Sequence, residues 1–147
     1  MLTDLKEEFN FDSFVVGPSN DYAYNAAVAI SSAPGKQYNP FFIYGGVGLG
    51  KTHLLHAIGN SVYEKFPNKK IILITAENFT NEFISSINSK KTSSFKNKYR
   101  NADVLLIDDI HFFQDKQGVQ EELFNTFNAL YDAKKQMVFT SDRPPSE

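Results

Sequence analysis

The sequence contains no cysteine and no tryptophan, and arginine occurs only at positions 100 and 143. The absence of cysteine excludes disulfide bonds and thiolate metal sites. No apolar run approaches the roughly 18 residues that a membrane-spanning helix needs. The N-terminal segment also lacks the basic-then-apolar order of a secretory signal. We therefore expect a cytoplasmic protein with no membrane span.

Neither sign of charge is in clear excess, because 15 Lys and Arg residues face 17 Asp and Glu residues, for a net charge of −2. Any contact with nucleic acid must therefore come from a local basic patch. The length of 147 residues suits one domain. Hydrophobic residues make up 41% of the chain and include 14 Phe and 7 Tyr, so we expect a globular core rich in aromatic rings.

Apolar runs and helical patterns alternate along the chain. Buried strands are predicted at residues 41–44, 70–75, 104–107 and 137–140, and helices at 21–33, 51–66, 77–88 and 117–133, with a second short helix around Phe95 and Tyr99. Residues 1 to about 20 read as irregular, with a helix cap at Ser19 or Asn20. This alternation predicts an α/β fold of three layers, a parallel sheet with helices on both faces.

Residues 45–52 read Gly-Gly-Val-Gly-Leu-Gly-Lys-Thr, between the first predicted strand and the next helix. This is a complete phosphate-binding loop, in which Gly46, Gly48 and Gly50 let the backbone N–H groups point at phosphate oxygens. Lys51 reaches the β- and γ-phosphates, and the Thr52 hydroxyl is a ligand of Mg²⁺. The alternative is a glycine-rich turn without a ligand. The flanking strand and helix favour a nucleoside triphosphate site.

Acidic residues follow two later strands. Asp108 and Asp109 end the third strand, where the Mg²⁺-side partner of a phosphate loop is expected. Asp108 would hold the hydrated cation, and Asp109 would orient the attacking water. Asp142 follows the fourth strand and would reach the γ-phosphate if that strand lies between the other two. The alternatives are a plain acidic strand end for the pair and a simple turn for Asp142.

Phosphoryl-transfer sites commonly use an arginine to complete charge stabilisation. Neither Arg100 nor Arg143 sits at an obvious phosphate position, so we expect this arginine to come from a neighbouring subunit or from beyond residue 147. The basic segment 90–100 could contact a nucleic-acid backbone. Its composition fits better a solvated helical hairpin whose aromatic residues face the core. His53 and His56 lie one helical turn apart, but with no third ligand in sight packing is favoured over a metal site.

These features together resemble the AAA+ ATPase domain of the bacterial DnaA-type replication initiators. The resemblance covers nearly the whole chain and rests on five segments: Phe11–Gly17 with Asn20, Asn39–Asn60, Leu105–Phe113, Gln120–Leu130 and Thr140–Pro145. It implies that the ligands are ATP and Mg²⁺, with Val15 and Val16 near the adenine. It also implies that Asp108 and Asp109 form the Walker B motif and that Asp142 is sensor 1.

The resemblance further implies a domain plan and partners. Residues 1–10 would be a linker and 11–147 a partial AAA+ domain, with a helical insertion at about 77–101 that shapes an ATP-dependent filament. Ile84 and Lys116 match positions that contact single-stranded origin DNA. Double-stranded origin DNA would bind through a domain absent here, and the replicative helicase machinery would be a partner.

Two departures from the family accompany the resemblance. Gly118 stands where some relatives have a basic residue, and the chain ends before the arginine finger, the last strand and the lid. In the family's strand order, 5-1-4-3-2, the first strand would then lie at an edge, so we expect marginal stability or self-association there. Three alternatives remain: a helicase loader or transposition-helper ATPase, a nucleotide or small-molecule kinase, and a catalytically inactive ATP-binding module.

Overall fold

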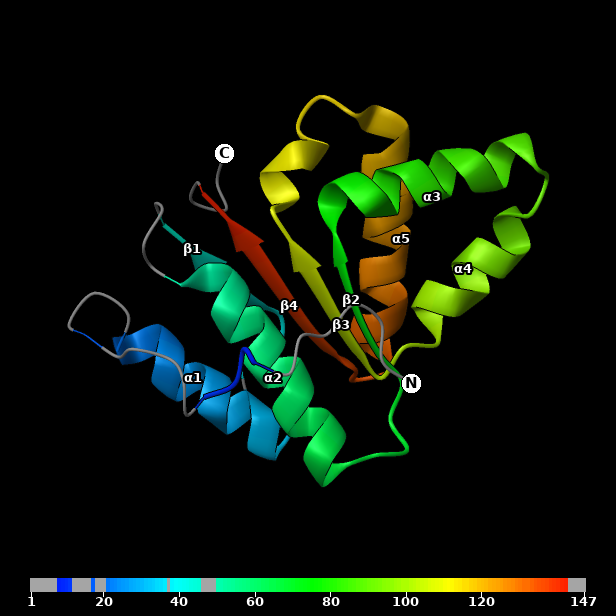
Figure 1. The fold of residues 1–147 in the computed structure, drawn as a ribbon. Helices are drawn as coiled ribbons and strands as arrows, with labels where there is room; N and C mark the ends of the chain where they lie inside the picture. Colours follow the sequence, from blue (N-terminus) through cyan, green and yellow to red (C-terminus); the bar gives the residue numbers. More distant parts are fainter. Residues whose placement is uncertain (1–7, 12–16, 18–20, 37, 46–49, 143–147) are drawn as a thin grey trace.

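The computed structural model describes residues 8–11, 17, 21–36, 38–45 and 50–142. Its strands form one parallel sheet in the order β1-β4-β3-β2, as Figure 1 shows. The strands are β1 (Phe41–Tyr44), β2 (Ile71–Thr75), β3 (Val104–Asp108) and β4 (Gln136–Ser141). The helices are α1 (Asp21–Ser32), α2 (Lys51–Lys65), α3 (Ala76–Asn88), α4 (Thr92–Arg100) and α5 (Gln117–Asp132), with a short 3₁₀ helix, η1 (Ile110–Phe113).

The predicted α/β fold is confirmed, and each predicted strand and helix end lies within one residue of the observed one. The predicted cap at Ser19 or Asn20 lies outside the described residues. The sheet order also agrees with the 1-4-3-2 part of the order that the resemblance implies. The sequence did not predict η1, which follows β3 directly. Within the described residues β1 pairs only with β4, so it is an edge strand of the described sheet.

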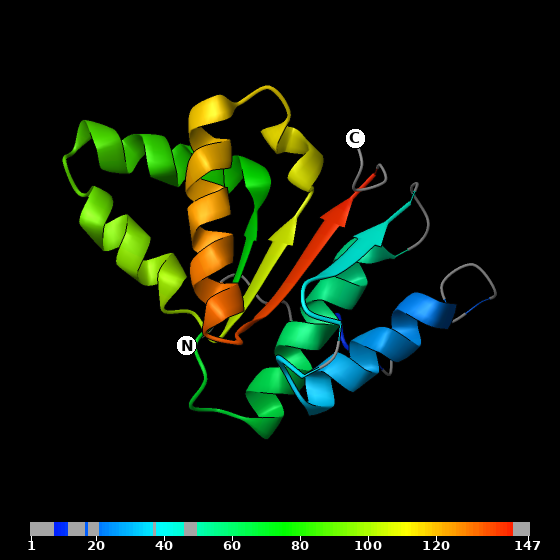
Figure 2. The same ribbon diagram turned by 180° about the vertical axis from the view of Figure 1, so that it is seen from behind.

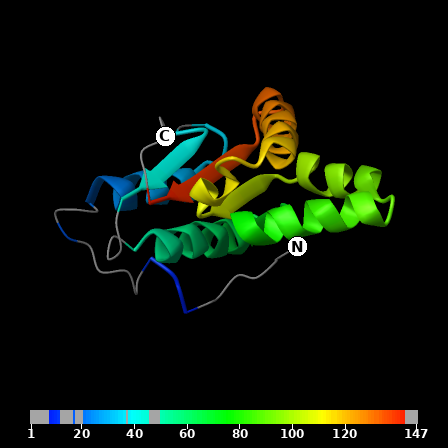
Figure 3. The same cartoon turned by 90° about the horizontal axis from the view of Figure 1, so that it is seen from above.

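Helices cover both faces of the sheet, as the views in Figures 2 and 3 show. The core under α1 and α2 takes alternate strand residues: Phe41, Ile43, Ile71, Leu73, Val104, Leu106 and Val138. The core on the α5 side takes the intervening residues: Ile72, Ile74, Leu105, Ile107, Met137 and Phe139. The strands are thus apolar on both sides, which explains their continuous hydrophobic runs. No helix of the described residues is long and apolar enough to cross a bilayer.

Helices α3 and α4 form a pair that projects beyond the β2 edge of the sheet (Figure 3). α3 begins immediately after β2, because the Thr75 hydroxyl accepts the Asn78 backbone N–H at 3.1 Å and caps the helix. Phe95 and Tyr99 of α4 are buried with Phe79, as the helical-hairpin interpretation of the basic segment expected. The pair therefore shares the core on the α5 side while its remaining surface faces solvent.

Only part of the apolar side of α5 is buried in the core. Val119 and Leu130 are buried, but Phe124 is 63% exposed, and the buried face of the helix also includes Glu122 and Thr126. The Glu122 carboxylate lies 3.3 Å from Arg100 Nη2, across the contact between α4 and α5. This ion pair allows a charged residue to occupy the inner face, and Phe124 lies on the exposed side of α5.

His53 and His56 pack against the Phe9 ring, with ring centroids 5.2 and 5.4 Å apart, and His53 Nε2 is 2.7 Å from the Asn10 backbone oxygen. Packing is the role that the sequence favoured for both. Their contacts attach the described part of the N-terminal segment to α2.

Gly35 is essential to the turn that precedes β1. Its φ is +84°, and a Cβ there would lie 2.4 Å from the Lys134 backbone oxygen. We expect Gly35→Ala to lower the free energy of unfolding by at least about 1 kcal/mol, since both the backbone and the contact oppose a side chain. Gly118→Ala is the control, because a Cβ at this position of α5 would have no neighbouring atom within 4 Å. It should stabilise the chain by about 0.5 kcal/mol. Urea unfolding of both variants measures the difference, and equal stability would contradict the prediction.

Candidate nucleotide-binding site

The carboxyl ends of β1, β4 and β3 meet at one edge of the sheet, beside the start of α2 (Figure 1). Gly45, which follows β1, donates its N–H to the Ser141 backbone oxygen of β4 at 3.2 Å. Gly50 adopts a left-handed conformation (φ 80°) and is the N-cap of α2. The phosphate-loop motif therefore leads into the N-terminus of α2, which favours bound anions. The ends of β3 and β4, with their aspartates, lie beside it.

Asp108 lies at the centre of this edge. Along β3 it shares the α2-facing side with Val104 and Leu106, because side chains alternate along a strand. The Thr52 hydroxyl of α2 donates to Asp108 Oδ2 at 2.8 Å. Asp108 is 6% exposed. The structure thus brings together Thr52 and Asp108, the two residues predicted as Mg²⁺ ligands.

Thr140 of β4 connects the two aspartates, and sequence reasoning missed it. Its hydroxyl donates to Asp108 Oδ1 and accepts the Asp109 backbone N–H at 2.8 Å. β4 pairs with β3 so that Ile107 faces Phe139, which puts Thr140 level with Asp108. Strand alternation and register together could have identified this residue, but the sheet order was needed to apply them.

Asp109 follows β3 with a left-handed backbone (φ 60°) and is the N-cap of η1. Partial burial raises the pKa of its carboxyl group above the ordinary value. The negative charge of Asp108 and, less strongly, that of Asp142 act in the same direction, against the lowering effects of His111 and Lys51. The Asp109 carboxyl group is therefore harder to ionise in the folded chain than a free aspartate.

We expect Asp109→Asn to raise the melting temperature at pH 7 by about 2 °C, after allowance for solvent screening. The raised pKa means that ionising Asp109 is harder in the folded chain than in the unfolded one. Its cost to stability is therefore present at neutral pH and disappears as the pH falls through the ordinary value of 3.8.

Thermal unfolding of the Asp109→Asn variant across this pH range measures the effect. Asp115→Asn is the matched control, because Asp115 has nearly the same φ, 62°. The control should show no such pH-dependent gain. If the Asp109→Asn variant had the same melting temperature as the wild type at pH 7, the raised pKa assigned to Asp109 would be contradicted.

Lys51 opens α2, and its Nζ donates to the Gly45 backbone oxygen at 2.6 Å. This contact holds the Lys51 ammonium beside Gly45, the first residue of the phosphate-loop motif. The remaining predicted nucleotide contacts, Gly46, Gly48, Val15 and Val16, lie outside the described residues.

Asp142 lies beside His111 of η1. His111 Nδ1 is 3.3 Å from the Asp142 backbone N and 3.2 Å from Asp142 Oδ1. A neutral ring can accept the amide N–H, and a protonated ring can donate to the carboxylate. Because β4 lies between β1 and β3, Asp142 meets the condition that the sequence set for reaching the γ-phosphate. His111 fixes its position on the side of η1.

The donor set fits a magnesium ion. A threonine hydroxyl and a carboxylate are hard oxygen ligands, the type that Mg²⁺ prefers, and Mg²⁺ completes its shell with water and phosphate oxygens. The described part of the chain contains no group of three or more His, Asp or Glu side chains that could hold a metal ion. A cation at Thr52 and Asp108 would therefore depend on a bound triphosphate for its remaining ligands.

The two predicted nucleic-acid contacts lie on neighbouring elements. Ile84 is 48% exposed on α3. Lys116 precedes α5 as its N-cap, and its Nζ lies 4.1 Å from the centroid of the Phe112 ring. α3 contacts η1, which leads to Lys116. The two residues therefore lie on elements that are connected through η1.

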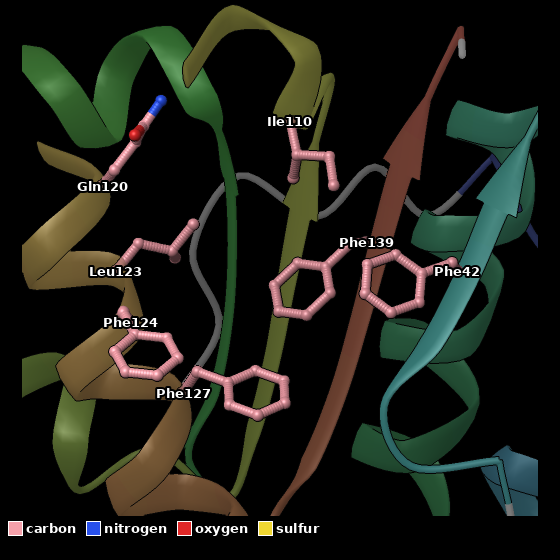
Figure 4. Close-up of a pocket in the computed structure, with 7 residues that line it drawn as sticks. All are labelled: Phe42, Ile110, Gln120, Leu123, Phe124, Phe127 and Phe139. Atoms are coloured by element: carbon pink, nitrogen blue, oxygen red, sulfur yellow. The ribbon is translucent and has the colours of Figure 1, made fainter. Parts of the chain in front are cut away.

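An apolar groove of about 260 Å³ lies on the α5 side of the sheet, next to β1 and β4 (Figure 4). Its lining is almost entirely hydrophobic, with residues Phe42, Ile110, Gln120, Leu123, Phe124, Phe127 and Phe139. Phe42 and Phe139 contribute adjacent rings, with centroids 5.3 Å apart. None of these described lining residues is charged, which distinguishes the groove from the acidic edge.

Comparison with known proteins places these features in a family. The family description "Bacterial DnaA ATPase domain" matches residues 5–147. The chromosomal replication initiator protein DnaA of Treponema denticola is 62% identical over 144 residues, which are 98% of this chain and 30% of that protein. The chain thus spans about 30% of the length of this curated relative.

Solved structures agree. Domain III of the Thermotoga maritima replication initiation protein DnaA is 50% identical with a TM-score of 0.95, covering 99% of this chain and 60% of that one. A replication initiator DnaA bound to AMPPCP and single-stranded DNA is 36% identical with a TM-score of 0.94, covering 99% of this chain and 45% of that one. With the family match spanning nearly the whole sequence, the chain belongs to the family of bacterial DnaA ATPase domains.

Proposed function

We propose that this chain binds ATP with Mg²⁺ and that the bound nucleotide controls its assembly on single-stranded DNA during replication initiation. The observation that carries the proposal is the 2.8 Å contact between Thr52 and Asp108, which joins the end of the phosphate-loop motif to the acidic strand. The related DnaA structure, which is bound to AMPPCP and single-stranded DNA, supports ATP and single-stranded DNA as ligands.

Each described residue of the candidate nucleotide-binding site has a role in this proposal. Lys51 binds the β- and γ-phosphates, and Thr52 and Asp108 hold the cation. When bound, Mg²⁺ would neutralise charge on the phosphate oxygens. Asp109 orients the water that attacks the γ-phosphorus, so that a P–O bond forms to water and the bond to the ADP oxygen breaks.

Two further residues control position. Thr140 fixes the Asp108 carboxylate and the Asp109 backbone through one hydroxyl. Asp142 contacts the γ-phosphate, and His111 holds the Asp142 side chain in place. Hydrolysis is slow without an arginine from a neighbouring copy or from another part of the protein, because neither arginine of this chain is assigned to the phosphate. Arg100 pairs with Glu122, and Arg143 lies outside the described residues.

The domain plan belongs to the same proposal. Residues 1–10 act as a linker, residues 11–147 form the base of the AAA+ domain, and the insertion at about 77–101 corresponds to α3 and α4. In the assembled state copies associate into a filament, a further domain binds double-stranded origin DNA, and the replicative helicase machinery is recruited. The second candidate is a module that binds ATP without hydrolysing it. Single-turnover hydrolysis, measured with and without a neighbouring subunit that supplies the arginine, distinguishes this module from a slow ATPase.

The DNA contact gives a direct test. We expect Lys116→Ala to weaken binding of a labelled oligo-dT strand about fivefold in the presence of ATP and Mg²⁺, since one phosphate contact is lost. Its dependence on salt should also become shallower. Fluorescence anisotropy at several salt concentrations measures both. Lys65→Ala, an exposed lysine at the end of α2, is the matched control. Binding by Lys116→Ala equal to the control would remove Lys116 from the DNA site.

A further inference from the structure

A polar hollow of about 620 Å³ lies at the amino edge of the sheet, at the opposite end of β1 and β4 from the nucleotide-binding site. It forms between the segment before β1 and the turn that joins α5 to β4. Its lining residues are Pro34, Gly35, Lys36, Tyr38, Asn39, Tyr131 and Lys134. This volume is within the range of small-molecule sites, about 300–1,000 Å³.

The walls of the hollow are held in place without a ligand. The buried Gln136 side chain accepts the Gly35 N–H at 2.7 Å and donates to the Tyr38 backbone oxygen at 3.1 Å. The Asn39 side chain donates to the Lys135 backbone oxygen at 2.7 Å and accepts the Met137 N–H at 2.9 Å. These four bonds join segments 96 to 101 positions apart in the sequence. The shape is therefore preformed, which lowers the entropic cost of binding.

Two backbone positions of the hollow are unusual. Tyr38 and Lys134 have φ values of 53° and 61°, in the left-handed region that non-glycine residues rarely adopt. At Lys134 this conformation ends α5, where the Lys135 N–H donates to the Leu130 backbone oxygen at 2.8 Å, as left-handed residues commonly do after a helix. Here the two positions direct one aromatic and one cationic side chain to the same hollow.

The charges in the described lining are all positive. Lys36 and Lys134 are exposed, and neither forms an ion pair with a described residue. The neighbouring Lys135 differs, because its Nζ is 2.8 Å from Asp103. No aspartate or glutamate is among the described residues that line the hollow. Two such ammonium groups at one concave site attract an anion, and lysine is a common phosphate ligand.

The aromatic rings are fixed and accessible. Tyr131 is 52% exposed and stacks on Phe127, with centroids 5.9 Å apart and planes at 6°. Tyr38 is 40% exposed and is held edge-on by Phe41, with centroids 5.8 Å apart. Aromatic faces beside lysines suit a ligand with both a base and a phosphate.

We propose that this hollow binds a nucleotide unit, with Lys36 and Lys134 at the phosphate and the exposed face of Tyr38 or Tyr131 against the base. A free mononucleotide and one unit of a single strand share this chemistry. The site is separate from the triphosphate loop, so occupation of one does not exclude the other.

The test is an NMR titration of the ¹⁵N-labelled chain with dTMP, with the oligonucleotide dT6 and with inorganic phosphate. We expect dTMP or dT6 to shift the amide signals of Gly35 and Lys134. Shifts from dTMP identify a free nucleotide as a sufficient ligand, and shifts from dT6 alone identify a single strand. Both results support the proposal. Signals of Thr52 and Asp109 report on the triphosphate loop, so failure there and failure at the hollow are distinguishable.

Variants add a second measurement. Lys36→Gln with Lys134→Asn should weaken binding at the hollow about tenfold, and asparagine suits the left-handed backbone at position 134. Lys65→Gln with Lys69→Gln removes the same charge elsewhere and should leave binding unchanged. Two results would overturn the proposal: unmoved Gly35 and Lys134 signals with both dTMP and dT6, or equal shifts and affinity with inorganic phosphate alone.

Discussion

Replacing Lys51 with alanine should weaken ATP binding about 100-fold in isothermal titration calorimetry, equivalent to about 2.7 kcal/mol. The Lys51 ammonium is held at the foot of the phosphate loop by its 2.6 Å contact with Gly45. Removing it leaves the β- and γ-phosphates without their nearest side-chain cation, and charge-assisted contacts of this kind are the strongest in a phosphate site. A nonhydrolysable analogue such as AMPPCP avoids turnover during the titration.

Two controls make the Lys51 experiment specific. Lys65→Ala removes the same charge from the last turn of the same helix and should bind ATP normally. EDTA should weaken binding to the wild type, because Thr52 and Asp108 would then have no cation to hold. ATP affinity unchanged in a folded Lys51→Ala variant would refute the assigned site.

Arg100→Met should lower the free energy of unfolding by about 3 kcal/mol, the largest stability change among the variants proposed. Arg100 Nη2 lies 3.3 Å from both carboxylate oxygens of Glu122, whose side chain is 4% exposed. Without Arg100, only the Thr126 hydroxyl, at 3.2 Å from Oε2, would accompany a buried negative charge among the described residues. The same change would loosen the contact between α4 and α5, because the pair bridges these helices.

Denaturant unfolding with matched variants separates charge burial from packing. Lys98→Met changes another residue of α4 and breaks its exposed pair with Glu82 of α3, which should cost less than about 1 kcal/mol. The double variant Arg100→Met with Glu122→Leu should recover much of the lost stability, since no buried charge remains. A single Arg100→Met variant as stable as Lys98→Met would mean that Glu122 is not held by this pair.

The sequence predicted the strands well because each one is a distinct apolar run between clear breaks, and most of the helices because their apolar residues recur at helical spacing. Ile71–Thr75, for example, follows a Pro-Asn turn and is rich in β-branched residues. The short η1 was missed because a four-residue helix has too few positions to show a period. Its unusual start, the left-handed Asp109, is supported by the hydrogen bond from its backbone N–H to Thr140 of β4.

Side chains whose roles depend on tertiary contacts were harder to predict. Asp108 and Thr52 were identified from motifs, and the structure brings them within hydrogen-bonding distance. Thr140 required the register between β3 and β4. The exposure of Phe124 followed from the pairing of Glu122 with Arg100, which joins residues 22 positions apart on different helices. A helical stripe of apolar residues could not reveal which face of α5 that ion pair would occupy.

The apolar groove beside α5 has a practical consequence for handling the isolated chain. Its phenylalanine rings form an apolar surface through which copies of the chain can self-associate. A net charge of only −2 provides little repulsion between these copies. The sequence isoelectric point is about 5.9, so mild acidification brings the net charge to zero. Purification and storage should therefore favour slightly alkaline buffers, with precipitation appearing first on the acidic side.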